Sequence, residues 1–220
     1  MDYPKILINL DRRPDRLNKF KKNFNYEFER ISAIDGKELY IKANNIYYKN
    51  NIIFENANFF KTIKKGEIGC FLSHKLAWEK VIDKNEPCII FEDDVELLLP
   101  LNNIIDIFKN NLDILFLGIW TKYDQERFYQ HNTSLIDNNK DKGYFPYSNQ
   151  KRQLYTYAYI ITPNTAKKLI DNIINFPVAI TLDHYIHKVM YNQETIIYPY
   201  KCFAQQGNSD IQGKVNFYYL

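Results

Sequence analysis

Residues 87–97 read PCIIFEDDVEL, and this stretch decides the fold class. The apolar run at 88–91 has the length and the β-branched content of a strand that is buried on both faces, as strands of parallel and mixed sheets are. The run ends on three consecutive acids, Glu92, Asp93 and Asp94. Ligands of α/β proteins bind beyond the ends of central strands, so we expect these carboxylates to lie in a ligand crevice.

Three neighbouring carboxylates repel one another, and a cation that neutralises them relieves this repulsion. A divalent metal ion with oxygen ligands suits such a position. From the three acids alone, an acidic turn in water is the alternative interpretation. The sequence before and after the acids decides between the two.

Length and composition favour a single domain of enzyme size. The 220 residues can bury about 70% of the surface of the unfolded chain. A net charge of +3, from 29 basic and 26 acidic residues, produces no overall field that favours nucleic acid. The cysteines, Cys70, Cys88 and Cys202, lack metal-type spacing, and we interpret them as reduced residues of a cytosolic protein.

The sequence contains no targeting or membrane-spanning pattern. Its N-terminal apolar run is too short for a signal peptide, and no stretch has the length of a membrane span. We therefore expect a cytoplasmic protein. The basic run at 61–65 leaves a peripheral contact with an anionic membrane open, although a solvated face is the simpler interpretation.

Expected strands and helices alternate along most of the chain, which predicts an α/β fold. Pro14 suits the first turn of a helix, and Leu17, Phe20 and Phe24 give that helix an apolar stripe. The expected strands are 5–10, 28–34, 88–91, 113–118, 154–162 and 195–198, and the expected helices are 14–24, 66–83, 102–112, 166–175 and 181–191.

Two segments do not follow this alternation. Residues 37–62 are rich in Asn, Tyr and Lys, and we expect an irregular excursion over the sheet. Residues 121–150 are polar and Tyr-rich, and a loop of that length in a compact domain is a lid, a substrate-binding segment or disorder.

The turn after the first strand carries Asn9, Asp11, Arg12, Arg13 and Arg16. Positive charge at a helix N-terminus can hold a nucleotide, although arginines in a first turn are commonly just exposed.

The second strand ends on Asp35 and Gly36. The Asp35 carboxylate can accept hydrogen bonds from a ribose or a base, and an ordinary Asp-Gly turn is the equally simple alternative.

The helix at 66–83 places Cys70, His74 and Trp78 on one stripe, with Ser73 beside them. A helix that packs directly before the acidic strand can present Ser73 and His74 to the same crevice. A packed histidine without a functional role is the alternative. Near the other end of the chain, Asp183 follows Thr181 in the first turn of a helix, where the helix dipole alone is an adequate reason for a carboxylate.

Seven motifs come in the order seen in glycosyltransferase family 25, which the chain resembles from residue 6 to residue 211. That family includes bacterial lipooligosaccharide galactosyltransferases and collagen-modifying galactosyltransferases. Of these motifs, those in the block at 66–97 are the most specific to the family. The motifs are INLDRRPDR at 8–16, AIDG at 33–36, GEIGCFLSHKLAWEKV at 66–81, IIFEDDVEL at 89–97, DILFLG at 113–118, TLDHYI at 181–186 and QQGNSDI at 205–211.

The resemblance implies a GT-A-like fold, which is a Rossmann-type α/β sandwich with a mixed, mostly parallel sheet, in one domain over 1–220. It implies a UDP-sugar donor, Mn²⁺ or Mg²⁺, and a glycan or glycoconjugate acceptor. The hexose is galactose, glucose or N-acetylglucosamine, and 37–62 and 121–150 are the segments expected to choose the acceptor.

The same resemblance implies roles for individual residues. Asp94 and Glu92 would bind the metal, with Asp93 on the donor side. Asp183 would be the base that deprotonates the acceptor. The remaining donor-binding residues would be Asn9, Arg13, Asp35 and Gly36 at the uridine and ribose, Ser73 and His74 at the diphosphate or donor sugar, and Asp210, which could also bind metal.

The implied reaction is a single displacement that inverts the anomeric carbon, with one base, because the metal takes the place of a general acid. One rival is a hydrolase that uses the same carboxylates. A second rival is a non-catalytic relative that binds a UDP-sugar or a glycan.

Overall fold

The computed structural model describes residues 2–60, 62–98, 100–101, 108, 112–118, 144–146, 156–175, 180–190, 196–199 and 204–206. Within these residues the centre is a seven-stranded sheet with the strand order β2-β1-β6-β10-β8-β11-β9. Five of these strands run in one direction, whereas β10 and β9 run in the other. The strands are β1 (Lys5–Asn9), β2 (Glu29–Ser32), β6 (Cys88–Glu92), β8 (Ile114–Phe116), β9 (Tyr144–Pro146), β10 (Ala158–Ile161) and β11 (Ile196–Pro199).

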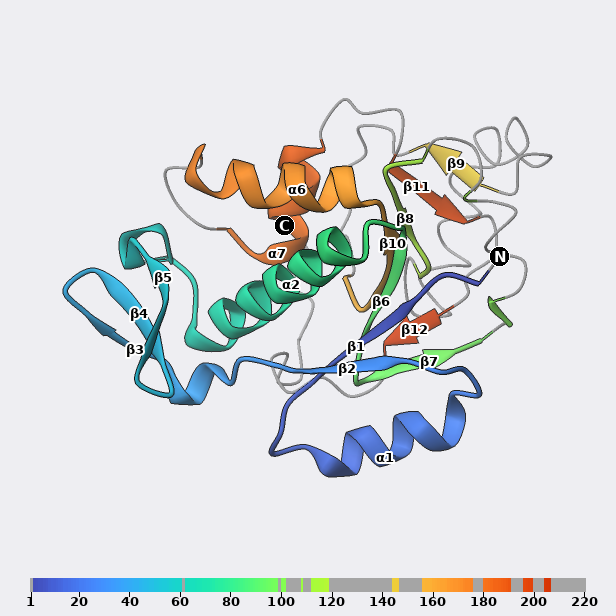
Figure 1. Cartoon of the computed structure of the whole chain (residues 1–220), viewed down its shortest axis with the longest axis horizontal. Helices are drawn as coiled ribbons and strands as arrows, with labels where there is room; N and C mark the ends of the chain where they lie inside the picture. Colours follow the sequence, from blue (N-terminus) through green and yellow to red (C-terminus); the bar gives the residue numbers. More distant parts are fainter. Residues whose placement is uncertain are drawn as a thin grey trace, which may run out of the picture.

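Helices cover both faces of this sheet, as Figure 1 shows. Helix α1 (Pro14–Asn23) lies on one face, and α2 (Lys65–Lys84), α6 (Pro163–Asn172) and α7 (Leu182–Val189) lie on the other. Because side chains alternate along a strand, β1 sends Ile6 and Ile8 into the core under α2 and Leu7 into the core under α1. This arrangement confirms the predicted α/β sandwich with a mixed sheet.

Most predicted elements lie where the periodicity puts them. Helix α1 begins at Pro14, α2 differs from the predicted 66–83 by one residue at each end, and β6 is a fully internal strand between β1 and β10. Most of the predicted helix at 102–112 and most of the loop at 121–150 lie outside the described residues, and the described part of that loop is the strand β9.

The expectation of an irregular excursion at 37–62 is wrong. A 3₁₀ helix (Gly36–Glu38) leads into an antiparallel sheet of β3 (Tyr40–Lys42), β4 (Asn45–Tyr48) and β5 (Asn51–Glu55), followed by a second 3₁₀ helix (Ala57–Phe60). The two hairpins turn through Ala43-Asn44 and Lys49-Asn50, all with positive φ between 47° and 65°. Two consecutive residues of positive φ make the tight hairpin turn that asparagine tolerates, and the strands are too short for a clear period.

Two glycines fix helix α2 against the end of β2. A Cβ on Gly36 would lie 2.2 Å from the backbone oxygen of Lys65, and a Cβ on Gly69 would lie 2.5 Å from that of Ile34. Only glycine permits this approach of backbone to backbone. The contact sets the position of the N-terminal half of α2 relative to the strand ends.

Strand β12 (Ala204–Gln206) pairs antiparallel with β7 (Val95–Leu97), which follows the acidic turn. Among the helices that the structure describes, none combines the length and the apolar character needed to cross a lipid bilayer.

Candidate active site

The predicted site residues gather at one edge of the large sheet. Strands β1, β2 and β6 are parallel, so their carboxyl ends lie on the same side. Asn9 ends β1, Glu92 ends β6, and Asp35 follows β2. A pocket of about 380 Å³ opens at this edge beside α2, which is within the usual size of small-molecule sites. Its lining includes seven of the predicted residues: Asp35, Gly36, Ser73, His74, Glu92, Asp93 and Asp94.

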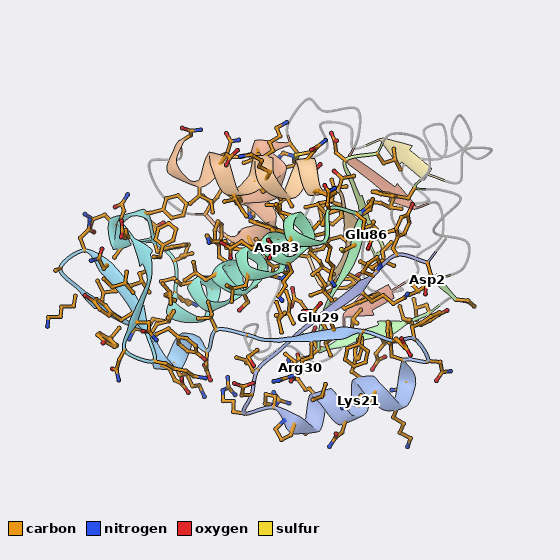
Figure 2. The ribbon with its side chains drawn as sticks, in the orientation of Figure 1. Asp2, Lys21, Glu29, Arg30, Asp83 and Glu86 are labelled. Carbon is orange, nitrogen blue, oxygen red and sulfur yellow. The ribbon has the colours of Figure 1, made fainter. Side chains whose placement is uncertain are left out.

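Asp93 is held by hydrogen bonds within the protein. Arg30 donates to Oδ1 of Asn9 (2.8 Å), which leaves the Asn9 amide nitrogen to donate to Oδ2 of Asp93 (2.7 Å). Arg16 donates to Oδ1 of Asp93 (2.9 Å). Figure 2 shows Arg30 on the α1 side of β2 and its neighbour Glu29 on the α2 side. Asn9, predicted to bind the donor, therefore reaches the site through Asp93 and is not part of the described pocket lining.

Glu92 and Asp94 have the chemistry of a hard metal site. Both line the pocket, and oxygen ligands suit Mg²⁺ and Mn²⁺. Oε1 of Glu92 accepts a hydrogen bond from Thr156 (3.2 Å) and lies 3.3 Å from Nε2 of His74, so Oε2 is the oxygen available to a ligand. Asp94 has one oxygen 3.8 Å from the Arg16 guanidinium, and its side chain is 4% exposed. The donor set fits the implied metal.

Ser73 and His74 line the pocket, but their polar atoms are engaged inside the protein. The Ser73 hydroxyl donates to the Gly69 carbonyl (2.6 Å) and accepts from the Ile34 amide (2.8 Å), which ties α2 to the chain beyond β2. Both ring nitrogens of His74 have partners, Tyr159 and Glu92. Their contact with a diphosphate stays a prediction.

Asp35 caps the 3₁₀ helix that follows it and is ionised. Burial raises its pKa, but the backbone amide of Lys37 (3.0 Å) and the guanidinium of Arg12 lower it more, so the pKa of Asp35 lies below the ordinary 3.8. Each carboxylate oxygen has one of these partners and can accept a second hydrogen bond, as from a ribose or a base.

A basic wall of the pocket was not among the predicted site residues. Arg12 and Arg16 belong to the turn that the sequence singles out, whereas Lys64 and Lys65 belong to a run interpreted as a solvated face. Lys37 also lines the pocket. The N-terminus of α2 lies here, and its dipole favours an anion; Glu67 of its first turn already accepts from the Lys64 amide (2.7 Å). The pocket lining thus combines these basic residues, called the basic wall below, with the acids Asp35, Glu67, Glu92, Asp93 and Asp94.

Arg13 lies in a neighbouring cavity. This second pocket, of about 190 Å³, shares Arg16, Asp93 and Asp94 with the first, and Arg13 pairs there with the exposed Asp15 (2.7 Å). The structure therefore does not bring Arg13 into the lining with Asp35.

Asp183 stands in the first turn of α7, as predicted, with its side chain 25% exposed. It is not among the described residues of the pocket lining. Its charge nevertheless contributes, after burial and the charge of Glu92, to raising the pKa of the Cys70 thiol, which does line the pocket. Burial raises the pKa of Asp183 itself, but hydrogen bonds with His184 and Thr181 lower it to below 3.8. Asp210 lies outside the described residues.

Taken together, the fold and the site define an α/β protein with a charged ligand pocket at the carboxyl ends of its parallel strands. The sequence pattern described as "Glycosyltransferase family 25 (LPS biosynthesis protein)" matches residues 2–186. The chain belongs to glycosyltransferase family 25.

The relatives of the chain include a protein named as a galactosyltransferase and a family member named inactive. Procollagen galactosyltransferase 2 of Homo sapiens is 28% identical over 205 residues, which cover 87% of this chain and 30% of that protein. Inactive glycosyltransferase 25 family member 3 of Homo sapiens is 31% identical over 126 residues, covering 51% of this chain and 21% of that protein. The chain thus spans less than a third of the length of these curated relatives.

Among solved structures, a galactosyltransferase in complex with donor and acceptor sugar analogues aligns with a TM-score of 0.48 and 11% identity. The alignment covers 89% of this chain and 72% of the other.

Proposed function

We propose that the protein transfers a hexose, which is galactose, glucose or N-acetylglucosamine, from a UDP-sugar to a hydroxyl of a glycan or glycoconjugate, with inversion of the anomeric carbon. The observation that carries the proposal is the presence, in the lining of one pocket of about 380 Å³, of the carboxylates Glu92 and Asp94 together with the basic residues Arg12, Lys37, Lys64 and Lys65. Both groups suit a nucleoside diphosphate-sugar, because basic residues attract its phosphates and the carboxylates would hold a metal ion that stabilises the negative charge of the leaving diphosphate.

In this proposal the basic wall and the N-terminus of α2 bind the diphosphate, and Asp35 accepts from the ribose. Glu92 and Asp94 hold Mn²⁺ or Mg²⁺, which supplies Lewis-acid stabilisation of the departing UDP. Asp93 keeps Arg16 and the acidic turn in place. This division differs from the expectation that Ser73 and His74 face the diphosphate, because their polar atoms already have partners.

Asp183 is proposed as the base. Its pKa below 3.8 means that the carboxylate is ionised at neutral pH and can accept a proton from the acceptor hydroxyl. The charge that it exerts on Cys70 supports a position near the pocket.

The small sheet is proposed to bind the acceptor. The chain leaves the pocket lining at Lys37 and returns to it at Lys64, with β3, β4 and β5 between. Tyr40, Tyr47 and Ile52 are aligned across the three strands on one face, and the two tyrosine rings stack at 4.9 Å. Tyr40 and Ile52 are exposed, and rings with a polar tip suit a sugar surface.

The test is the equilibrium binding of UDP by calorimetry, with Mn²⁺ and with EDTA, for the wild type and Asp94→Ala. We expect binding that requires both Mn²⁺ and Asp94. Absence of UDP binding under all four conditions would contradict the proposal. A non-catalytic binder is the second candidate, favoured by the relative named inactive, and it predicts the same binding without transfer.

A further inference from the structure

His74 is a fully buried residue of the pocket wall whose protonation pattern decides its role. Its Nδ1 lies 2.7 Å from the Tyr159 hydroxyl oxygen, and its Nε2 lies 3.3 Å from Oε1 of Glu92. The potential ligand atoms of Cys70, His74 and Glu92 also lie within 4.8 Å of one another. A thiolate, an imidazole and a carboxylate are ligands typical of a zinc site. A metal ion at that site would need the lone pair of Nε2. The location of the imidazole proton therefore decides whether His74 can bind a metal ion or donates a hydrogen bond to Glu92.

The hydrogen-bond donors next to His74 indicate which ring nitrogen carries the imidazole proton. The indole nitrogen of Trp78 can only donate, and it lies 2.9 Å from the Tyr159 oxygen. Within the described part of the chain, Tyr159 has only Trp78 and His74 as hydrogen-bond partners. Burial raises the pKa of Tyr159, so the hydroxyl keeps its proton. That proton can go only to Nδ1 of His74, which is therefore the acceptor.

A neutral imidazole that accepts at Nδ1 carries its proton on Nε2. Nε2 then donates to Oε1 of Glu92, the oxygen that also accepts from Thr156. A protonated Nε2 cannot bind a metal ion.

We propose that Trp78, Tyr159 and His74 form a directed hydrogen-bond chain that holds Glu92 by Oε1 and presents Oε2 to the pocket. His74 is a positioning residue in this chain and contacts neither the metal nor the diphosphate. The order of donation is Trp78 to Tyr159, Tyr159 to His74, and His74 to Glu92. The consequence for metal binding rests on the proposed function, whereas the direction of the chain does not.

The direction is tested by nitrogen-15 NMR of the histidine rings in the metal-free protein. The chain has four histidines, and loss of one signal set in His74→Gln assigns the ring. We expect the His74 proton on Nε2 and an unprotonated Nδ1. A proton on Nδ1 would overturn the proposal, and so would a Co²⁺ thiolate charge-transfer band that disappears in Cys70→Ser.

The positioning role is tested by Mn²⁺ affinity in two matched variants. Tyr159→Phe breaks the chain, whereas Tyr185→Phe removes another buried hydroxyl, which donates to the Leu169 carbonyl. We expect both variants to lose thermal stability, but only Tyr159→Phe to weaken Mn²⁺ binding by about tenfold or more, as loss of a partner behind a metal ligand does. Equal Mn²⁺ affinities would overturn the positioning role.

The NMR measurement and the Mn²⁺ affinities test this proposal separately from the proposed function. If the wild type binds no Mn²⁺, the metal part of the proposed function fails. The NMR measurement still decides the direction of the chain in that case, because it needs neither metal nor substrate.

Discussion

The guanidinium of Arg16 lies 2.9 Å from Oδ1 of Asp93, and both side chains are about nine-tenths buried, at 11% and 8% exposure. The other oxygen of Asp93 accepts from Asn9. Both oxygens of this acid are therefore used to join β1, α1 and the turn after β6. The three consecutive acids are not equivalent: Asp93 has internal partners, while Glu92 and Asp94 contribute oxygens to the pocket wall.

This division predicts opposite effects of two similar substitutions. Asp93→Asn should lower the free energy of unfolding by about 1–3 kcal/mol, because a charged hydrogen bond to Arg16 is lost. Asp94→Asn should change stability less but abolish the dependence of UDP binding on Mn²⁺. Urea denaturation and calorimetry measure the two quantities. A variant pair in which Asp93→Asn abolished metal dependence and Asp94→Asn did not would contradict this division.

The glycine contact predicts the sign of a stability change. In an unconstrained helix, Gly69→Ala should stabilise by about 1 kcal/mol through helix propensity. The added Cβ would lie 2.5 Å from the Ile34 oxygen and 2.8 Å from the Gly36 amide nitrogen. We therefore expect a net loss of about 1–3 kcal/mol, as in other overpacked sites. Urea denaturation decides, and a stabilised variant would show that α2 does not pack as described.

The low pKa of Asp183 predicts a pH profile. A carboxylate whose pKa lies below 3.8 stays ionised as the pH falls from 8 to about 4, and loses its charge only as the pH falls through that lowered pKa. Transfer should therefore show no acid limb from this group above about pH 4. An acid limb between pH 5 and 7 that disappears in Asp183→Asn would contradict the assignment.

The same residue has a direct test. Asp183→Asn should lower the rate of transfer on the order of 10²- to 10⁴-fold, the usual contribution of a general base. UDP binding should be unchanged, because Asp183 lies outside the described pocket lining. Equal losses of binding and transfer would point to a structural effect of the substitution.

The small sheet predicts an effect confined to the acceptor. Tyr47→Ala should raise the KM for the acceptor by about tenfold, which corresponds to a contact of about 1.4 kcal/mol. UDP release without acceptor should not change. Ile41→Ala is the matched control, because Ile41 is 55% exposed and aligned with Ile46 on the opposite face. Equal effects of the two variants would remove the sheet from the acceptor site.

Local patterns were sufficient to predict much of the fold. Three elements can be recognised from residues that are neighbours in the sequence, and all three are confirmed. They are the apolar strand β6, the helix α1 that begins at Pro14, and the long periodic helix α2. The small sheet was missed because its strands are three to five residues long and its turns depend on positive φ at Asn44 and Asn50.

The roles of the site residues depend on distant partners. Asp93 is bound by Asn9 and Arg16, which are 84 and 77 residues away in the chain. The helical stripe placed His74 in the pocket wall correctly. It could not reveal that Tyr159, 85 residues further on, holds the ring. Lys64 and Lys65 were interpreted as a solvated face because nothing nearby in the sequence indicates the pocket.

The most direct test of the proposed transfer is UDP release from a panel of UDP-sugars, with Mn²⁺ or EDTA and with or without candidate acceptor sugars, comparing the wild type with Asp94→Ala. We expect one donor to be consumed only with metal and intact Asp94, and faster with an acceptor. Equal release by Asp94→Ala, or by the wild type in EDTA, would contradict a metal-dependent transferase at this site.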